Sequence, residues 1–226
     1  MKNRTYTSSD KMLALISNDY RHLHVLSRFG IPLGFHDQTI EEVCRNAGVD
    51  CDTFLTMVNF INTDEKPEIS KLSLSALLHY LKQSHSYFLD FYLPSIRRKL
   101  LEAITMKDTD VSFLIIKLFD EYVDGVREHM EEEEQHLFSY VEALIDNQGV
   151  RTDNLPVYSK HHEEVGSKLR ELKNIIIRYC PADSSANLLN AALYDIFRCE
   201  EELGSHCRIE DHLLLPAIQW QKMKMA

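Results

Sequence analysis

Two stretches of the chain place a histidine, a glutamate and a leucine at the same spacing. Residues 129–137 read His-x-x-x-Glu-x-x-x-Leu, and residues 206–214 repeat this pattern. Residues four apart in an α-helix lie on one face, a single turn from each other. Each stretch therefore directs one imidazole and one carboxylate the same way, beside an apolar residue suited to a core.

The two stretches are 77 residues apart, and the same offset links two further histidines. These are His85 and His162, each 44 residues before its own His-x-x-x-Glu pattern. The chain thus resembles two copies of one helical hairpin. Together the copies supply six candidate metal ligands: His85, His129, Glu133, His162, His206 and Glu210.

The donor types indicate which metals such a group would hold. Imidazole and carboxylate without cysteine suit iron, manganese or zinc. Six ligands exceed the four of a structural zinc site, so the set predicts two metals, with Glu133 and Glu210 able to bridge them. Two inward-facing carboxylates also need a cation to offset the loss of their hydration.

Other interpretations of single residues remain open. A histidine on an apolar helix face, such as His85 or His162 taken alone, is more often an ordinary core residue. The Glu-x-x-His pattern of ferritin-like sites occurs once, at Glu133 and His136, and has no second copy. We therefore expect His136 beside the site or on the surface. Three neighbouring acids are interpreted as a solvated face: Glu131, Glu132 and Glu134.

Apolar periodicity and turn residues predict an all-α chain in two parts. Residues 1–65 are expected to form a small three-helix N-terminal domain, with a first helix from about residue 10 to 29. Capping signals start the second helix at Thr39 and the third at Asp50, and Gly48 separates them. Residues 66–226 are expected to form an up-down four-helix bundle. Its helices cover about 73–104, with a bend at Pro94, then 110–147, 155–180 and 185–222.

Composition argues against several classes of function. The net charge of −10 opposes binding to nucleic acid. No apolar run approaches the roughly 18 residues that span a membrane. The five cysteines show no C-x-x-C spacing. We interpret them as reduced thiols of a cytoplasmic protein.

The sequence resembles the iron–sulfur cluster repair di-iron proteins, which combine a hemerythrin-like bundle with a small N-terminal domain. The likeness of the bundle rests on residues 128–138, 162–166, 206–210 and 214–216. That of the N-terminal domain rests on residues 28–32 and 39–49. The resemblance implies two non-haem iron ions with an oxo- or hydroxo-bridge, held by the six residues found above. It also implies a role in repairing clusters damaged by nitric oxide or oxidants, with the damaged iron–sulfur proteins as partners.

The chain departs from that family in two places. The family has a further histidine about twenty residues beyond the position of His85, where this chain has Glu102 to Asp108 without histidine. One metal is therefore expected to have an open position, with Glu102 as a weak substitute ligand. The family's cysteine pair is replaced by Leu33 to His36, so the N-terminal domain is interpreted as a packing or docking module.

These features leave three functions to compare. The first is a stress-response protein that repairs clusters. The second is a sensor or carrier of oxygen or nitric oxide that relays the change to a protein partner. The third is a bundle whose metal is structural. Enzymatic activity is neither indicated nor excluded, because no substrate pocket with a general base can be inferred from the sequence. The assembly is also open, with a homodimer as one arrangement.

Overall fold

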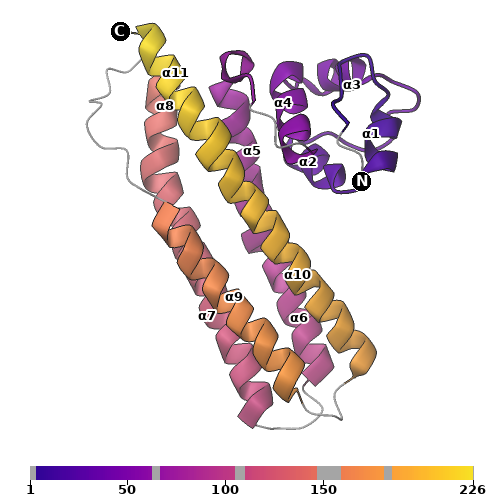
Figure 1. Ribbon diagram of the computed structural model, residues 1–226, viewed down its shortest axis with the longest axis vertical. Coiled ribbons are helices and arrows are strands. Elements are labelled where there is room, and N and C mark those ends of the chain that lie inside the picture. The colour runs from indigo at the N-terminus through magenta and orange to yellow at the C-terminus, as the bar shows by residue number, and fades with distance from the viewer. Residues whose placement is uncertain (1–3, 63–66, 105–109, 147–158, 181–184, 226) are drawn as a thin grey trace. The chain divides into compact units, whose positions relative to one another are not determined.

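The computed structural model describes residues 4–62, 67–104, 110–146, 159–180 and 185–225, and the side chains of residues 159–166 lie outside the description (Figure 1). Within these ranges the regular structure is helical, apart from one isolated bridge between Lys11 and Thr39. The all-α prediction is confirmed. No helix among the described residues is long and apolar enough to cross a membrane.

The chain divides into two compact units. One contains Met1–Ser84, Val141–Gly149 and Arg208–Ala226, and the other contains His85–Tyr140 and Val150–Cys207. Three of the four division points fall within helices that continue along the chain, and the fourth lies outside the described residues. The domain boundary predicted at residues 65 and 66 lies outside the described residues and stays a prediction.

The first unit begins with four short helices: α1 (Met12–Asn18), α2 (His22–Arg28), α3 (Ile40–Ala47) and α4 (Cys51–Asn62). The prediction of one helix over residues 10–29 is therefore wrong. Asp19 interrupts it with extended backbone angles, φ −151° and ψ 106°. Its carboxylate accepts hydrogen bonds from the backbone N–H and the guanidinium of Arg21, and this local turn competes with helix continuation.

The starts of α3 and α4 follow the predicted capping signals. Thr39 and Glu42 form a reciprocal capping box, which satisfies two backbone N–H groups at the start of α3. Gly48 ends that helix in the left-handed region at φ +68°, which glycine adopts without steric cost. The Asp50 side chain accepts a hydrogen bond of 2.8 Å from the Thr53 N–H in the first turn of α4.

The rest of the first unit consists of bundle ends. It holds η1 (Ile69–Lys71), most of α5 (Leu74–Ser86) and α8 (Ser139–Ile145), and α11 (Leu215–Met225). The short helices contact α5 directly: the rings of Phe29 and Tyr80 lie 5.2 Å apart, and the Ser73 N–H donates to Thr53 Oγ1 over 2.9 Å.

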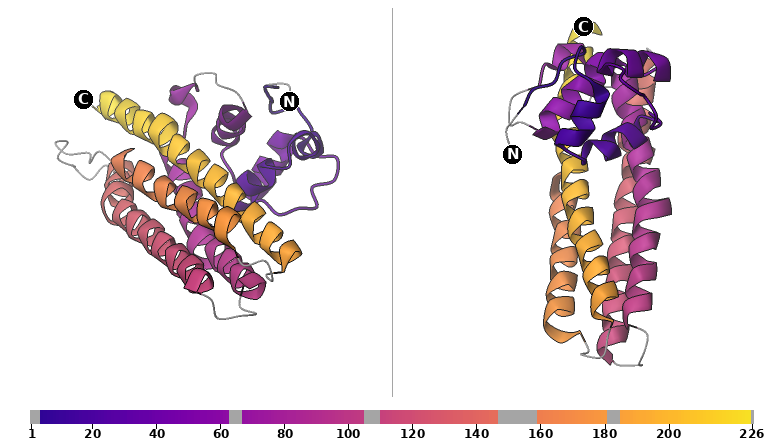
Figure 2. Two further views of the ribbon diagram at one scale, coloured as in Figure 1. Left: turned by 60° about the horizontal axis from the view of Figure 1, so that its bottom comes forward. Right: turned by 90° about the vertical axis from the view of Figure 1, so that its right-hand side faces the viewer.

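The second unit is built from four long antiparallel helical stretches, side by side in both views (Figures 1 and 2). The first combines the π-helical turn η2 (Tyr87–Tyr92) with α6 (Leu93–Ile104), and the second combines α7 (Asp110–Glu132) with the π-helical turn η3 (Glu133–Phe138). The others are α9 (Ser159–Tyr179) and α10 (Ala186–Ile209). The predicted up-down bundle is confirmed. Its buried core includes Phe88, Leu93, Ile96, Leu100, Ile115, Phe119, Tyr122, Val126, Leu172 and Ile196.

Within the described part of the chain, three π-helical turns interrupt the bundle helices. They are η2, η3 and η4 (Glu210–Leu214), and the last joins α10 to α11. In η2 the Leu93 N–H donates to the Phe88 carbonyl, five residues back. The irregularity predicted at Pro94 is thus displaced toward the N-terminus. Pro94 itself lies in the first turn of α6, where its missing N–H is tolerated.

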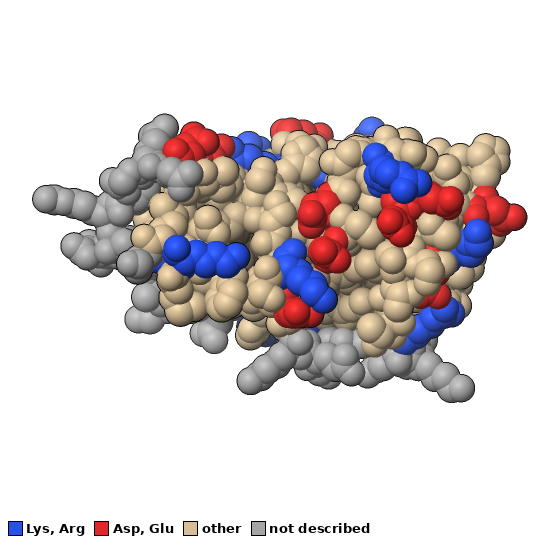
Figure 3. Space-filling model, turned by 90° about the horizontal axis from the view of Figure 1, so that it is seen from above, with Lys and Arg blue, Asp and Glu red and all other residues tan. Residues whose placement is uncertain are grey.

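Charged side chains of both signs are interspersed on the face seen in Figure 3. Basic residues lie beside acidic ones there. The ion pairs of the described residues include that between Lys82 and Glu142 at 2.5 Å. The net charge of −10 is not expressed as one continuous acidic field on this face.

Candidate metal centre

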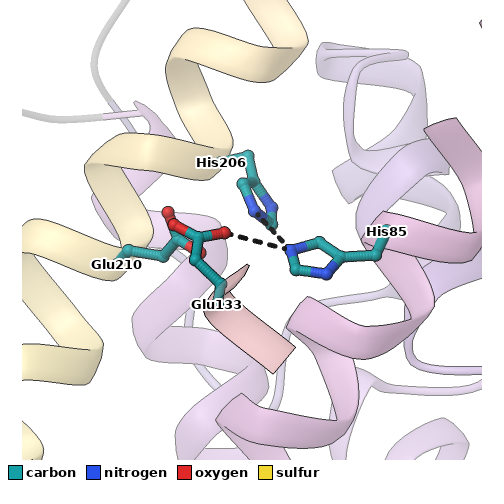
Figure 4. Close-up of side chains that lie close together, drawn as sticks. All are labelled: His85, Glu133, His206 and Glu210. Carbon is teal, nitrogen blue, oxygen red and sulfur yellow. Dashed lines mark hydrogen bonds and ion pairs between the residues drawn. The ribbon is translucent and has the colours of Figure 1, made fainter. Parts of the chain in front are cut away.

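Four of the six predicted ligands converge. His85, Glu133, His206 and Glu210 each offer one ligand atom, and these atoms all lie within 4.8 Å of one another (Figure 4). All four side chains are buried. They come from α5, η3, α10 and η4, so residues distant in sequence meet at one point in the bundle.

The imidazole of His85 is held on two sides. Its Nδ1 lies 2.9 Å from Glu134 Oε1, and its ring stacks on Phe138 with centroids 5.0 Å apart. The carboxylate accepts, so Nδ1 carries the proton and Nε2 keeps its lone pair. That Nε2 lies 3.2 Å from His206 Nε2 and 3.5 Å from Glu133 Oε2. The lone pair therefore points into the cluster, where a cation would be bound.

Glu133 lies between two imidazoles. Its Oε2 faces His85 Nε2 at 3.5 Å, and its Oε1 faces His129 Nε2 at 3.1 Å. The Glu133 side chain is only 1% exposed and that of His129 is 8% exposed. His129 and Glu133 are four residues apart, as the His-x-x-x-Glu pattern requires. One carboxylate thus addresses both histidines with different oxygens.

For the remaining predicted ligand, His162, the structure describes only the backbone. His162 belongs to α9, which packs along α7, but its side chain lies outside the described residues. Its role as a ligand stays a prediction. His136 is exposed, as one of the two expectations for it stated.

One expectation about acidic residues is incomplete and another is wrong. Glu134 is exposed, as expected for the solvated face, but its carboxylate also bonds to His85. Glu102 is an exposed residue of α6, 17 positions beyond His85. At 1.5 Å of rise per residue, that is roughly 25 Å along the helix, too far for Glu102 to share the site. The adjacent stretch without histidine, residues 105–109, lies outside the described residues.

A family comparison agrees with this geometry. The hemerythrin HHE cation-binding domain matches residues 76–218, which is more than half of the chain. The chain belongs to the hemerythrin family. All six predicted ligands lie within the matched range. Membership in a cation-binding family accounts for why two carboxylates are buried together with histidines in one cluster.

The hemerythrin-like chain also resembles a curated protein over most of its length. It is 21% identical over 182 residues to the iron–sulfur cluster repair protein ScdA of Staphylococcus haemolyticus, covering 78% of this chain and 82% of that protein. The coverage extends beyond the bundle, and the resemblance to the cluster repair proteins is confirmed.

A cysteine and a tyrosine are buried in the core of the same bundle. None of the five cysteines, all of which are described, forms a disulfide, and Cys199 is buried in the bundle. Burial raises the pKa of the Cys199 thiol to about 12 and the pKa of Tyr122 well above its ordinary value. Both groups stay protonated near neutral pH, and the four clustered candidate ligands contribute only imidazole nitrogens and carboxylate oxygens. Such a donor set fits iron, manganese or zinc.

Proposed function

We propose that this hemerythrin-like protein holds two iron ions and acts in the cytoplasm to repair iron–sulfur clusters damaged by nitric oxide or oxidants. The observation that supports two metals is the position of Glu133, whose two oxygens face His85 and His129 separately. A carboxylate placed in this way can give one oxygen to each of two cations. The repair role is supported by the likeness to ScdA, whose name describes that function.

The chain's own residues would divide the work at the centre. His85 and His206 would hold one iron, His129 and His162 would hold the other, and Glu133 and Glu210 would bridge the two. Bound iron would supply redox chemistry and a position for an exchangeable ligand. The histidines bind metal only as neutral imidazoles, so metal uptake should release protons and weaken as the pH falls.

A cavity beside the centre supports a second candidate function. Its lining includes His129 and His206. A small ligand could therefore approach the metals through the bundle without unfolding it. This observation favours a sensor or carrier of oxygen or nitric oxide as the alternative, with a protein partner that receives the signal.

Metal analysis after anaerobic purification tests the di-iron proposal. We expect two irons per chain and an oxo-bridge absorption band after oxygen is added. The variants His129→Ala and His162→Ala should each retain fewer than two irons. His136→Ala, which alters an exposed histidine, serves as the control and should retain both. A protein that binds only zinc, and whose absorption spectrum changes with neither oxygen nor nitric oxide, would contradict both the repair role and the sensor role.

Repair and gas sensing are then separated by a second measurement. Wild type and Glu133→Gln are each added to a [4Fe–4S] protein that nitric oxide has inactivated, and recovery of its activity is followed. Recovery with wild type alone supports repair. Reversible gas binding at the centre without recovery supports the sensor or carrier.

A further inference from the structure

A cavity of about 220 Å³ lies within the second unit, between α7, α9 and α10. Apolar side chains form much of its wall, including Val126, Met130, Leu169 and Leu203. An apolar cavity of about 150 Å³ is already large enough to bind benzene. This one therefore has room for a small organic molecule, which is much larger than a diatomic gas.

Gly204 lines this cavity, although the backbone conformation at this position does not require a glycine. It lies in the interior of α10, where glycine is about 1 kcal/mol less favourable than alanine. Its φ is not positive, and a Cβ built on it would meet no atom within 4 Å. Close packing therefore does not demand a glycine. Its consequence is that the cavity stays open on the side of α10.

The charged residues on the cavity wall are unequal. Glu200 forms an ion pair with the Lys173 ammonium, so its negative charge is balanced. Arg170 also lines the cavity and is exposed. Among the side chains that the structure describes, none forms an ion pair with Arg170. The rim thus offers one guanidinium to a ligand, with five N–H donors suited to a carboxylate.

We propose that this cavity is a binding site for a small organic carboxylate. The apolar body of the ligand would pack against Val126, Met130 and Leu203, and its carboxylate would bind Arg170. His129 and His206 also line the cavity, so the occupant would lie against two histidines of the centre. An occupant there would restrict the exchange of metal and small ligands. This last consequence rests on the proposed function, whereas the binding does not.

Calorimetric titration of the metal-free full chain tests the binding, with benzoate as the probe and benzyl alcohol as its neutral counterpart. We expect one benzoate per chain and weaker binding of the alcohol. Arg170→Gln should weaken benzoate by about fivefold, as expected for a partly exposed ion pair, and leave the alcohol unchanged. Gly204→Leu should abolish binding of both by filling the cavity, with its helical content checked by circular dichroism.

The matched control is Arg178→Gln, which removes another exposed arginine about two turns further along α9. Equal effects of the Arg170 and Arg178 variants, or no saturable benzoate binding, would overturn the proposal. If benzoate binds only when metal is bound, its carboxylate binds at the metal centre, and the proposed role of Arg170 is rejected. In the iron-loaded protein, saturating benzoate should slow iron release to a chelator. Failure of this step alone would count against the consequence at the centre and leave the calorimetric result standing.

Discussion

Removing the Glu134 carboxylate should make the centre lose metal faster. Glu134 touches no predicted metal position, but it accepts the Nδ1–H of His85 over 2.9 Å and so fixes both the ring orientation and the tautomer. Without it, the proton can move to Nε2, the atom that faces the cluster. The residue is thus a positioning group that acts through His85.

The magnitude follows from the exposure of the carboxylate. Outer hydrogen-bond partners of metal-bound histidines typically change metal affinity by about 10- to 100-fold. The Glu134 side chain is 47% exposed, and solvent screens its charge. We therefore expect the lower end of this range, about tenfold, which corresponds to about 1.4 kcal/mol. Glu134→Gln should lose less metal affinity than Glu134→Ala, because an amide oxygen can still accept the hydrogen bond from His85.

The assay is stopped-flow release of iron to a chelator at constant pH and ionic strength. Glu131→Ala is the control, since it removes one exposed acid from the same stretch and changes the net charge equally. Release from Glu134→Ala should be faster than from wild type and from this control. If the two alanine variants release iron at one rate, the hydrogen bond to His85 does not position the ring.

Three further predictions concern stability. Glu133→Gln should abolish the rise in melting temperature that bound metal gives the wild type. Without metal, the variant should melt at a higher temperature than the wild type, because one buried charge is gone. Equal metal-induced shifts of the melting temperature in scanning calorimetry would contradict this prediction. Burial lowers the pKa of His22 below its ordinary value of 6.5. As the pH falls, the unfolded chain therefore takes up the proton before the folded chain does. Helices α1–α4 should thus lose stability as the pH falls from 6.5 through the lowered pKa of His22. Hydrogen exchange of these helices should show that slope in the wild type and a flatter one in His22→Gln. Thr39→Ala should destabilise α3 by about 1 kcal/mol through loss of the capping box. The control Thr56→Ala, at a half-buried position in the middle of α4, should have a smaller effect in chemical denaturation.

Helix type and helix ends were predictable where one local rule dominated. The capping box at Thr39 and the left-handed glycine at residue 48 are local signals, and both act as expected. The break at Asp19 was missed because its neighbours keep a helical apolar pattern. An aspartate that bonds to the backbone two residues later can end a helix without glycine or proline.

The site was predictable to the extent that helical spacing carries it. His129 and Glu133 share a face of one helix, so their contact follows from the sequence. The approach of His85 to Glu133 and Glu134 depends on how separate helices pack, which spacing within one helix does not determine. The π-helical turns were missed as well, because they are rare single-turn insertions within helices whose apolar spacing already predicts an α-helix.

The 77-residue repeat extends further than the six ligands suggested. The turns η3 and η4 begin at Glu133 and Glu210, the two carboxylates that the offset pairs. Glu134 is paired in the same way with Asp211, another acid. The pairing of Glu134 with Asp211 could have indicated a role for Glu134, if the 77-residue offset had also been applied to the neighbours of the ligands. A π-helical turn shifts the helix register by one residue, so a repeated turn preserves the same placement of each glutamate in both halves. The repeat fails at the single histidines, because η2 follows His85 closely while α9 stays α-helical after His162. We therefore expect the two metal positions to share bridging carboxylates but to differ in their histidine surroundings, and the unequal pair suits a centre with one exchangeable position.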